Sequence, residues 1–327
     1  MSTSRLSVAV QEHGLSLPSE GRIAVFAPRA DADLSALDRA RVEVVQPVKP
    51  DHDVFERAGF ATAITESGRY SVAVVMVPRA KAQAKDLISR AAACADLIVV
   101  DGQKTDGIDS FLKETRKRAD LSGSLSKSHG RIFWFEGGEF GDWLAPETQD
   151  AGEGFVTRAG VFSADAIDPA SRALAAALPP KLGRVVADLG AGWGYLSSQI
   201  LKRDGVEVMH LVEADHVALE CAKLNIKDAR AQFHWNDVRD FKPGSRVDTV
   251  VMNPPFHTGR KAEPDLGVQF IRTAAKILAP AGQLWMVANR HLPYESALRE
   301  SFVKVEEVAG DRSFKILHAQ RPSRTKR

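Results

Sequence analysis

The chain has 327 residues, 44% of them hydrophobic and 26% charged, and its formal net charge is +2. This composition excludes a disordered or fibrous chain, and the length suggests two domains. The near-neutral charge permits a nucleic-acid partner without requiring one. Cys94 and Cys221 lack metal-ligand spacing, which argues against a disulfide framework and a zinc site.

The start of the sequence lacks the features of a signal peptide. Residues 1–14 contain no apolar segment of signal-peptide length, and no apolar run is long enough to cross a bilayer. Together with the unpaired cysteines, this predicts a cytoplasmic protein with no membrane partner.

The first half of the chain alternates short β-branched or aromatic runs with helical patterns. The predicted strands cover 22–28, 42–48, 72–78, 97–102 and 131–137. The serine- and glycine-rich segment 121–130 is predicted to be a loop.

The second half repeats this alternation. Strands are predicted at 184–190, 208–214, 231–237, 247–253 and 283–289, with amphipathic helices at 216–229 and 267–280. Strands that alternate with helices of this length indicate a parallel sheet covered on both faces, so the fold class is α/β and doubly wound.

The two halves are similar in sequence. The segment that begins at Arg22 aligns without gaps with the segment that begins at Arg184, and Val74–Pro78 aligns with Val250–Pro254. Two matches in the same order favour an internal duplication over chance. The polar, non-periodic segment 145–154 separates the halves, so we predict domains at 1–148 and 155–327.

The second half keeps a glycine-rich turn that the first half has lost. Gly190, Gly192 and Gly194 follow a predicted strand and precede a helix, where glycine permits positive φ and close approach of a ligand. The spacing differs from that of dinucleotide-binding proteins, and Asp188 stands two residues before the first glycine. The first half has Pro28, Ala30 and Ala32 at the glycine positions.

Three acidic residues end three successive predicted strands of the second half. Asp188 precedes the glycines, Glu213 is placed to accept hydrogen bonds from ribose hydroxyls, and Asp237 is placed to accept one from an adenine amine. The predicted ligand has a cationic tail, a ribose and an adenine, which describes S-adenosylmethionine better than NAD.

The catalytic element is predicted to be Asn253, Pro254, Pro255 and Phe256. Two acceptors, the side-chain oxygen of Asn253 and the carbonyl of Pro254, can bind the two N–H groups of an exocyclic amine and aim its nitrogen lone pair. The prolines restrict where both oxygens point. Phe256 can stack on a base.

These motifs together resemble the bacterial ribosomal RNA guanine-N2 methyltransferases, a family of class I S-adenosylmethionine-dependent enzymes. The closer similarity lies in 159–171, in Asn253–His257, in 287–294 and in 314–319. The resemblance implies two tandem Rossmann-like methyltransferase domains, the first degenerate and the second catalytic. It also implies that Phe162 and Asn253 contact the cofactor.

A basic group follows the strands of the predicted catalytic edge. It comprises His257, Arg260, Lys261, Arg290 and His291, and we expect it to bind RNA phosphates. Residues 113–131 of the first half form a second basic stretch, for which RNA docking and a solvated helix face are equally good readings. No histidine shows metal-ligand spacing, so no metal is expected.

The resemblance implies methylation of a guanine N2 amine in ribosomal RNA or a ribosomal subunit, with 16S RNA favoured over 23S RNA. Two alternatives stay open at this point: N-methylation of DNA adenine or of a protein glutamine, and a non-catalytic RNA-binding protein on a methyltransferase fold. Two fused domains of similar design make a monomer the expected state.

Overall fold

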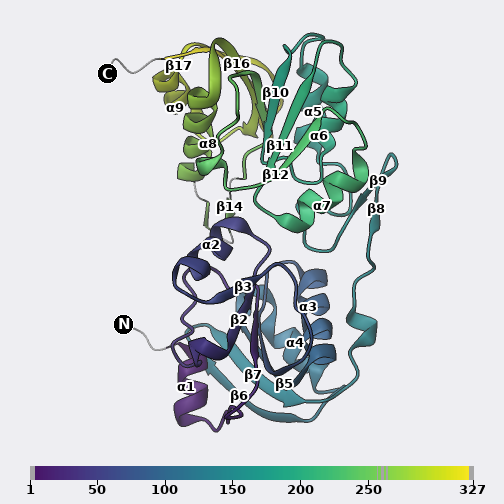
Figure 1. Ribbon diagram of the computed structural model, residues 1–327, viewed down its shortest axis with the longest axis vertical. Coiled ribbons are helices and arrows are strands. Elements are labelled where there is room, and N and C mark those ends of the chain that lie inside the picture. The colour runs from purple at the N-terminus through teal and green to yellow at the C-terminus, as the bar shows by residue number, and fades with distance from the viewer. Residues whose placement is uncertain (1–3, 256, 259–260, 263, 324–327) are drawn as a thin grey trace. The chain divides into compact units, whose positions relative to one another are not determined.

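The computed structural model describes residues 4–255, 257–258, 261–262 and 264–323, with no side-chain description for 257–264. The described chain divides into two compact units, Met1–Glu147 and Thr148–Arg327. Each unit is a seven-stranded sheet with helices on both faces (Figure 1). Among the described residues, no helix is both long and apolar enough to cross a membrane.

Unit 1 has a sheet of strand order β3-β2-β1-β4-β5-β7-β6. Its strands are β1 (Ile23–Phe26), β2 (Val42–Val45), β3 (Ala61–Ala63), β4 (Tyr70–Met76), β5 (Ala95–Gln103), β6 (Leu121–Lys127) and β7 (Gly130–Glu136). Its α-helices are α1 (Arg5–Glu12), α2 (Lys49–Arg57), α3 (Lys81–Cys94) and α4 (Ile108–Thr115).

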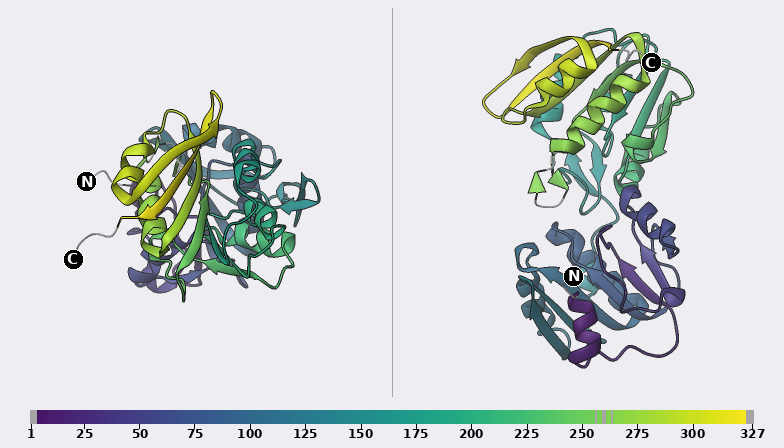
Figure 2. Two further views of the ribbon diagram at one scale, coloured as in Figure 1. Left: turned by 90° about the horizontal axis from the view of Figure 1, so that it is seen from above. Right: turned by 90° about the vertical axis from the view of Figure 1, so that its left-hand side faces the viewer.

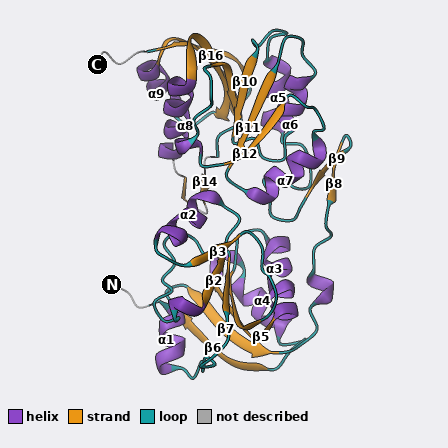
Figure 3. Cartoon of the chain, viewed as in Figure 1, coloured by secondary structure: helices purple, strands orange, loops and turns teal. Residues whose placement is uncertain are grey.

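Unit 2 repeats this topology as β12-β11-β10-β13-β16-β18-β17 (Figure 3). Its strands are β10 (Val185–Leu189), β11 (Val208–Glu213), β12 (Ala231–Trp235), β13 (Val247–Met252), β16 (Leu278–Asn289), β17 (Phe302–Gly310) and β18 (Phe314–Pro322). Its helices are α5 (Pro169–Ala177), α6 (Tyr195–Leu201), α7 (His216–Asn225), α8 (Pro264–Ile277) and α9 (Tyr294–Ser301). Two hairpins stand apart from the sheet, β8 (Gln149–Gly152) with β9 (Phe155–Thr157), and β14 (His257–Thr258) with β15 (Lys261–Ala262).

The central strands β10, β11 and β13 of unit 2 are buried on both faces. One face packs against α5, α6 and α7, and the other packs against α8 and α9 (Figure 2). Successive residues of β13 alternate between the faces, so Val251 joins the first core and Val250 and Met252 join the second. Asn253 therefore continues on the side of Val251, facing α5.

The two sheets also share their strand register. The sequence alignment superposes Ala24 on Val186 and Ala73 on Thr249. Ala24 lies opposite Ala73 in the β1–β4 ladder, and Val186 lies opposite Thr249 in the β10–β13 ladder. The predicted pair of tandem doubly wound domains is therefore confirmed in topology and in residue pairing.

Two predictions about regular structure were wrong. Each sheet is mixed rather than wholly parallel, because β7 and β18 run antiparallel to their neighbours. The predicted loop 121–130 contains β6, whose serines alternate outward at the sheet edge while Gly123 makes room for the ring of Trp134. The segment 145–154 includes the division between the two units after Glu147, and its residues Gln149–Gly152 form β8.

Candidate functional site

The glycine-rich turn connects β10 to α6 through three residues with positive φ. Gly190, Gly192 and Gly194 have φ of 77°, 54° and 92°. A Cβ on Gly194 would lie 2.8 Å from Ile226 Cδ1, whereas nothing lies within 4 Å of a Cβ placed on Gly192. Gly194 is therefore needed for packing, and Gly192 leaves open space beside the turn.

Asp188 is fully buried behind this turn. Its Oδ2 accepts a hydrogen bond from Ser197 Oγ at 2.8 Å, while its Oδ1 has no hydrogen-bond partner among the described residues. Burial, with a smaller contribution from the nearby Glu213, raises the pKa of Asp188 to about 7. A buried acceptor without a partner in this position fits a ligand that brings a positive charge or an N–H donor.

Glu213 fixes the turn from the end of β11. Its Oε2 accepts a hydrogen bond from Gly192 N at 2.7 Å, and its Oε1 accepts one from Asp215 N at 2.8 Å. Burial raises the pKa of Glu213 and raises the pKa of Asp215 to about 7. Three carboxyl groups thus crowd one end of the sheet, an arrangement that favours a cationic ligand.

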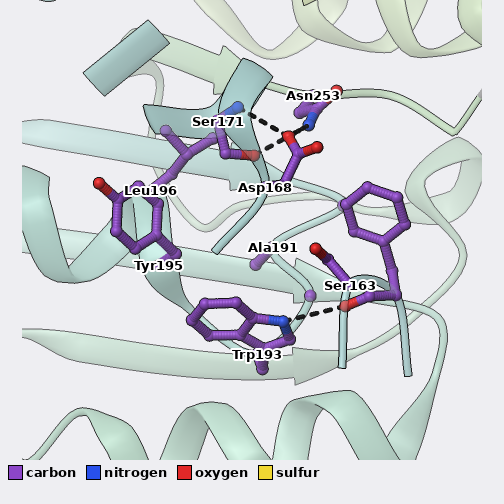
Figure 4. Close-up of a pocket in the computed structure, with 11 residues that line it drawn as sticks. Ser163, Asp168, Ser171, Ala191, Trp193, Tyr195, Leu196 and Asn253 are labelled. Carbon is purple, nitrogen blue, oxygen red and sulfur yellow. Dashed lines mark hydrogen bonds between the residues drawn. The ribbon is translucent and has the colours of Figure 1, made fainter. Parts of the chain in front are cut away.

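Asn253 follows β13 and is held by the start of α5. Its Nδ2 donates to Asp168 Oδ2 and to Ser171 Oγ, both at 2.9 Å (Figure 4). Asp168 is the N-cap of α5, and the same Oδ2 accepts a hydrogen bond from Ser171 N at 2.7 Å. The amide nitrogen of Asn253 is therefore engaged within the protein.

The glycine turn and Asn253 border one pocket, whose volume is about 390 Å³ with its solvent-open space included, whereas Asp188 and Glu213 do not line it. Four predicted site residues line it: Phe162, Gly190, Gly192 and Asn253. Asp168, Ser171, Trp193 and Tyr195 line it too, and none of these four was predicted.

Trp193 anchors the pocket wall that carries Phe162. Its Nε1 donates to the carbonyl oxygen of Phe162 at 2.9 Å, and its ring packs against Phe155 of the β8–β9 hairpin. The Phe162 side chain is exposed at the pocket. Asn225 completes the support, since its Nδ2 donates to the carbonyl oxygens of Trp193 and Val156.

Asp237 does not line the pocket and already has a partner. Both of its carboxylate oxygens accept hydrogen bonds from the guanidinium of Arg239, and its Oδ1 also accepts one from Arg239 N. An adenine amine would have to share or displace this contact. Pro254 is buried, and Pro255 is exposed beside Gly190.

The predicted RNA-binding residues are only partly described. Phe256 and Arg260 lie outside the described residues, and only the backbone of His257 and Lys261 is described. His291 is exposed at the end of β16. Arg290 is exposed too, but its guanidinium donates to Glu307 at 2.9 Å and to the carbonyl oxygen of Asp311, so it also anchors the β17–β18 turn.

Unit 1 fills the corresponding place with its own side chains. Gln46, which directly follows β2, accepts a hydrogen bond from Val48 N at 2.9 Å and donates to the carbonyl oxygen of Pro28 at 2.7 Å. Gln46 is buried, and Pro28 occupies the position of Gly190 in the alignment. The loop that could cradle a ligand is therefore tied to β2 in unit 1.

Sequence reasoning missed the contact between α5 and Asn253. The sequence Asp168-Pro169-Ala170-Ser171 is typical of a helix start, with an acidic N-cap and proline at the first helical position. That signal predicts α5, but nothing in it identifies a partner 85 residues away.

The residues of this site fit S-adenosylmethionine. The unpartnered Asp188 oxygen suits a cationic ligand, Gly192 allows close approach, and the engaged Asn253 nitrogen leaves the amide oxygen as the acceptor that can meet a substrate. The site can therefore hold a cationic ligand beside a substrate group that donates hydrogen bonds.

Comparison with known proteins gives three findings. The family model described as "Methyltransferase small domain" matches residues 153–318. The ribosomal RNA small subunit methyltransferase C of Hahella chejuensis is 28% identical, over 92% of this chain and 94% of that protein. The ribosomal RNA large subunit methyltransferase G of Aeromonas hydrophila is 33% identical, over 49% of this chain and 44% of that protein.

A solved structure has the same fold over nearly the whole chain. It is a T. thermophilus 16S rRNA N2 G1207 methyltransferase in complex with AdoMet and guanosine, with a TM-score of 0.78 and 24% sequence identity. The match covers 94% of this chain and 90% of that chain.

Proposed function

Because the chain belongs to the methyltransferase small domain family, we propose that it methylates the exocyclic N2 amine of a guanine in ribosomal RNA. The single observation that carries the proposal is the orientation of Asn253. With Nδ2 bonded to Asp168 and Ser171, Asn253 offers a substrate an acceptor oxygen, and an exocyclic amine is the base group that brings N–H donors.

In this proposal the cofactor is held by the residues around the glycine turn. Asp188 and Glu213 supply negative charge, Gly190 and Gly192 supply close backbone approach, and Phe162 covers the pocket. When bound, S-adenosylmethionine supplies a methyl group on a positively charged sulfur, whose electron pair stays with the sulfur as an amine nitrogen takes the methyl. Asp237 is the proposed adenine contact, provided that Arg239 yields one of its hydrogen bonds.

The substrate amine is held by two acceptors, the side-chain oxygen of Asn253 and the carbonyl of Pro254. Holding both N–H groups localises the lone pair on the nitrogen, which is otherwise delocalised into the base. Proline fixes φ at about −65°, so Pro254 and Pro255 limit the positions that these oxygens can take. Phe256 is proposed to stack on the base, a contact worth about 1–3 kcal/mol.

Ribosomal RNA is the proposed partner because of the names of the relatives. The relative that aligns with 92% of the chain is named for the small ribosomal subunit, whereas the one named for the large subunit aligns with 49%. We therefore favour 16S RNA. The target guanine has to leave its stack to enter the pocket.

The two domains are proposed to have different roles. Residues 155–327 carry the catalytic site, and residues 1–148 form a degenerate domain that supports folding and binds RNA. The hydrogen bonds of Gln46 across the unit 1 loop support the degenerate assignment. Arg290 and His291, with His257, Arg260 and Lys261, are the proposed phosphate contacts of the catalytic domain.

The test is methyl transfer from labelled S-adenosylmethionine to purified small subunits, large subunits, deproteinised RNA and naked DNA. We expect label on one guanine N2 of small-subunit RNA and at least a 100-fold loss of rate for Asn253→Ala. Label on DNA adenine or on a protein glutamine would replace the RNA assignment. Cofactor binding without any transfer would favour an RNA-binding role.

A further inference from the structure

We propose that Asp168 and Ser171 are positioning residues that hold the carboxamide of Asn253 in one orientation, with its oxygen toward the substrate. This inference rests on the proposed function, since it concerns the same acceptor oxygen. Neither residue is proposed to touch the reacting atoms. They act through Asn253, which comes from a different element of unit 2.

The hydrogen bonds leave Asn253 one orientation. A primary amide carries two N–H donors, and Asn253 Nδ2 meets two acceptors, Asp168 Oδ2 and Ser171 Oγ, each at 2.9 Å. Rotating the amide by half a turn would place its oxygen against a carboxylate oxygen. That arrangement loses a charge-assisted hydrogen bond and sets two acceptors face to face.

The position of Asp168 is itself fixed by α5. The same Oδ2 that accepts from Asn253 accepts from Ser171 N at 2.7 Å, which makes it the N-cap of the helix. Pro169 occupies the first helical position, and Leu174 of the next turn is fully buried in the core. A carboxylate at a helix N-terminus is also favoured by the helix dipole. The orientation of Asn253 is therefore tied to a rigid element.

This arrangement selects for the chemistry of the substrate group. An amide that could rotate would accept from an amine or donate to a carbonyl or ring nitrogen with equal ease. With Nδ2 committed to Asp168 and Ser171, only the acceptor is presented. The two residues thus make the pocket specific for a group that carries N–H donors.

Three variants separate this role from helix capping. Serine caps helices about as well as aspartate, so Asp168→Ser keeps the cap and removes the carboxylate, whereas Asp168→Ala removes both. Ser171→Ala keeps Ser171 N and removes only the hydroxyl contact. The matched control is Asp165→Ser, because Asp165 lies on the same segment, is exposed and contacts Gln149.

We expect Asp168→Ser to lower kcat about 10- to 100-fold, the loss expected of a misplaced catalytic group, with the KM and Kd for S-adenosylmethionine within 2-fold of wild type. Its Tm should stay close to the wild-type value, whereas Asp168→Ala should lower Tm by about 2–4 °C. Ser171→Ala should lower kcat by a smaller factor, and Asp165→Ser should match the wild type.

Two results would overturn the proposal: wild-type kcat for Asp168→Ser, which would leave capping as the whole role, or a loss of cofactor affinity as large as the loss of kcat. The double variant Asp168→Ser with Asn253→Ala distinguishes failure of the positioning role from failure of the proposed function. If Asn253→Ala is inactive, the second substitution should add no further loss, because Asp168 acts through Asn253. If Asn253→Ala keeps full activity, the proposed function fails first.

Discussion

Ser197 Oγ donates a hydrogen bond of 2.8 Å to Asp188 Oδ2, and both side chains are completely buried. The second oxygen of Asp188 has no hydrogen-bond partner among the described residues. A carboxyl group in this state is stabilised in its protonated form, because burial penalises the charge more than one hydroxyl can compensate. The first prediction follows from that pKa.

We expect the free energy of unfolding of the unliganded protein to decrease as the pH rises from about 4 to about 7, because of Asp188. The pKa of Asp188 is raised from 3.8 to about 7 in the folded state. Between these two pH values the folded state therefore holds a proton that the unfolded state has already released. Each such group lowers the free energy of unfolding by up to about 1.4 kcal/mol per pH unit there. Urea unfolding at several pH values, compared with Asp188→Asn, measures the effect.

The Asn variant cannot ionise, so its advantage in stability over the wild type should grow as the pH rises to 7. A constant difference would contradict the prediction. Cofactor binding should show the opposite trend, because a cation binds the ionised carboxylate better. The affinity for S-adenosylmethionine should therefore rise through pH 7 in the wild type and rise less in Asp188→Asn.

The second prediction concerns Gly194, where backbone conformation and packing both require glycine. Gly194→Ala places a Cβ at φ 92° and 2.8 Å from Ile226 Cδ1, so the free energy of unfolding should fall by about 2–4 kcal/mol. Gly205→Ala is the matched control, since Gly205 has φ 83° and open space around it. In Gly205→Ala the free energy of unfolding should fall by only about 1–2 kcal/mol. Equal losses would show that packing at Ile226 contributes nothing.

The third prediction is that each chain binds one molecule of S-adenosylmethionine. In unit 1, Gln46 links the loop carbonyl of Pro28 to Val48 N, so the place that Glu213 organises in unit 2 is occupied by protein. Isothermal titration should give a stoichiometry of one. Glu213→Ala should weaken that single site at least 10-fold, while Gln46→Ala should leave its affinity unchanged. A second S-adenosylmethionine site in the wild type that is lost in Gln46→Ala would contradict this prediction.

The fourth prediction concerns the basic residues in the last turn of α4 and just after it. Lys113, Arg116 and Lys117 are exposed, and among the described ion pairs none involves them. If they bind phosphates, changing all three to Gln should weaken RNA binding and reduce the slope of log K against log salt by about 2–3. A variant with Lys202, Lys223 and Lys227 changed to Gln alters the net charge equally and serves as the control. Equal effects in both variants would leave only a net-charge contribution.

Much of the fold was predictable because its signals are local. Strands such as β10 and β13 are short, mostly apolar segments, and the glycines between β10 and α6 have φ values that explain their presence. β6 was missed because serine and glycine alternate in an edge strand that buries little apolar surface. The antiparallel course of β18 depends on tertiary pairing, which no local pattern reports.

The site was predictable only in part, for the same reason. The spacing around Asn253 predicts an acceptor, but the residues that hold it belong to α5, far away in sequence. The position of Asp237 at a strand end predicts a free carboxylate, whereas the structure engages it with Arg239 two residues later. Which partner a polar side chain takes depends on geometry that folding creates.

The shared register of the two sheets has a consequence for how the chain folds. Because the two sheets have the same pairing pattern, a strand of one unit can pair wrongly with a strand of the other during folding, β4 with β10 or β13 with β1. The order of synthesis reduces this risk. All seven strands of unit 1 are complete at Glu136, before β10 begins at Val185, so the first sheet can close before its competitor leaves the ribosome.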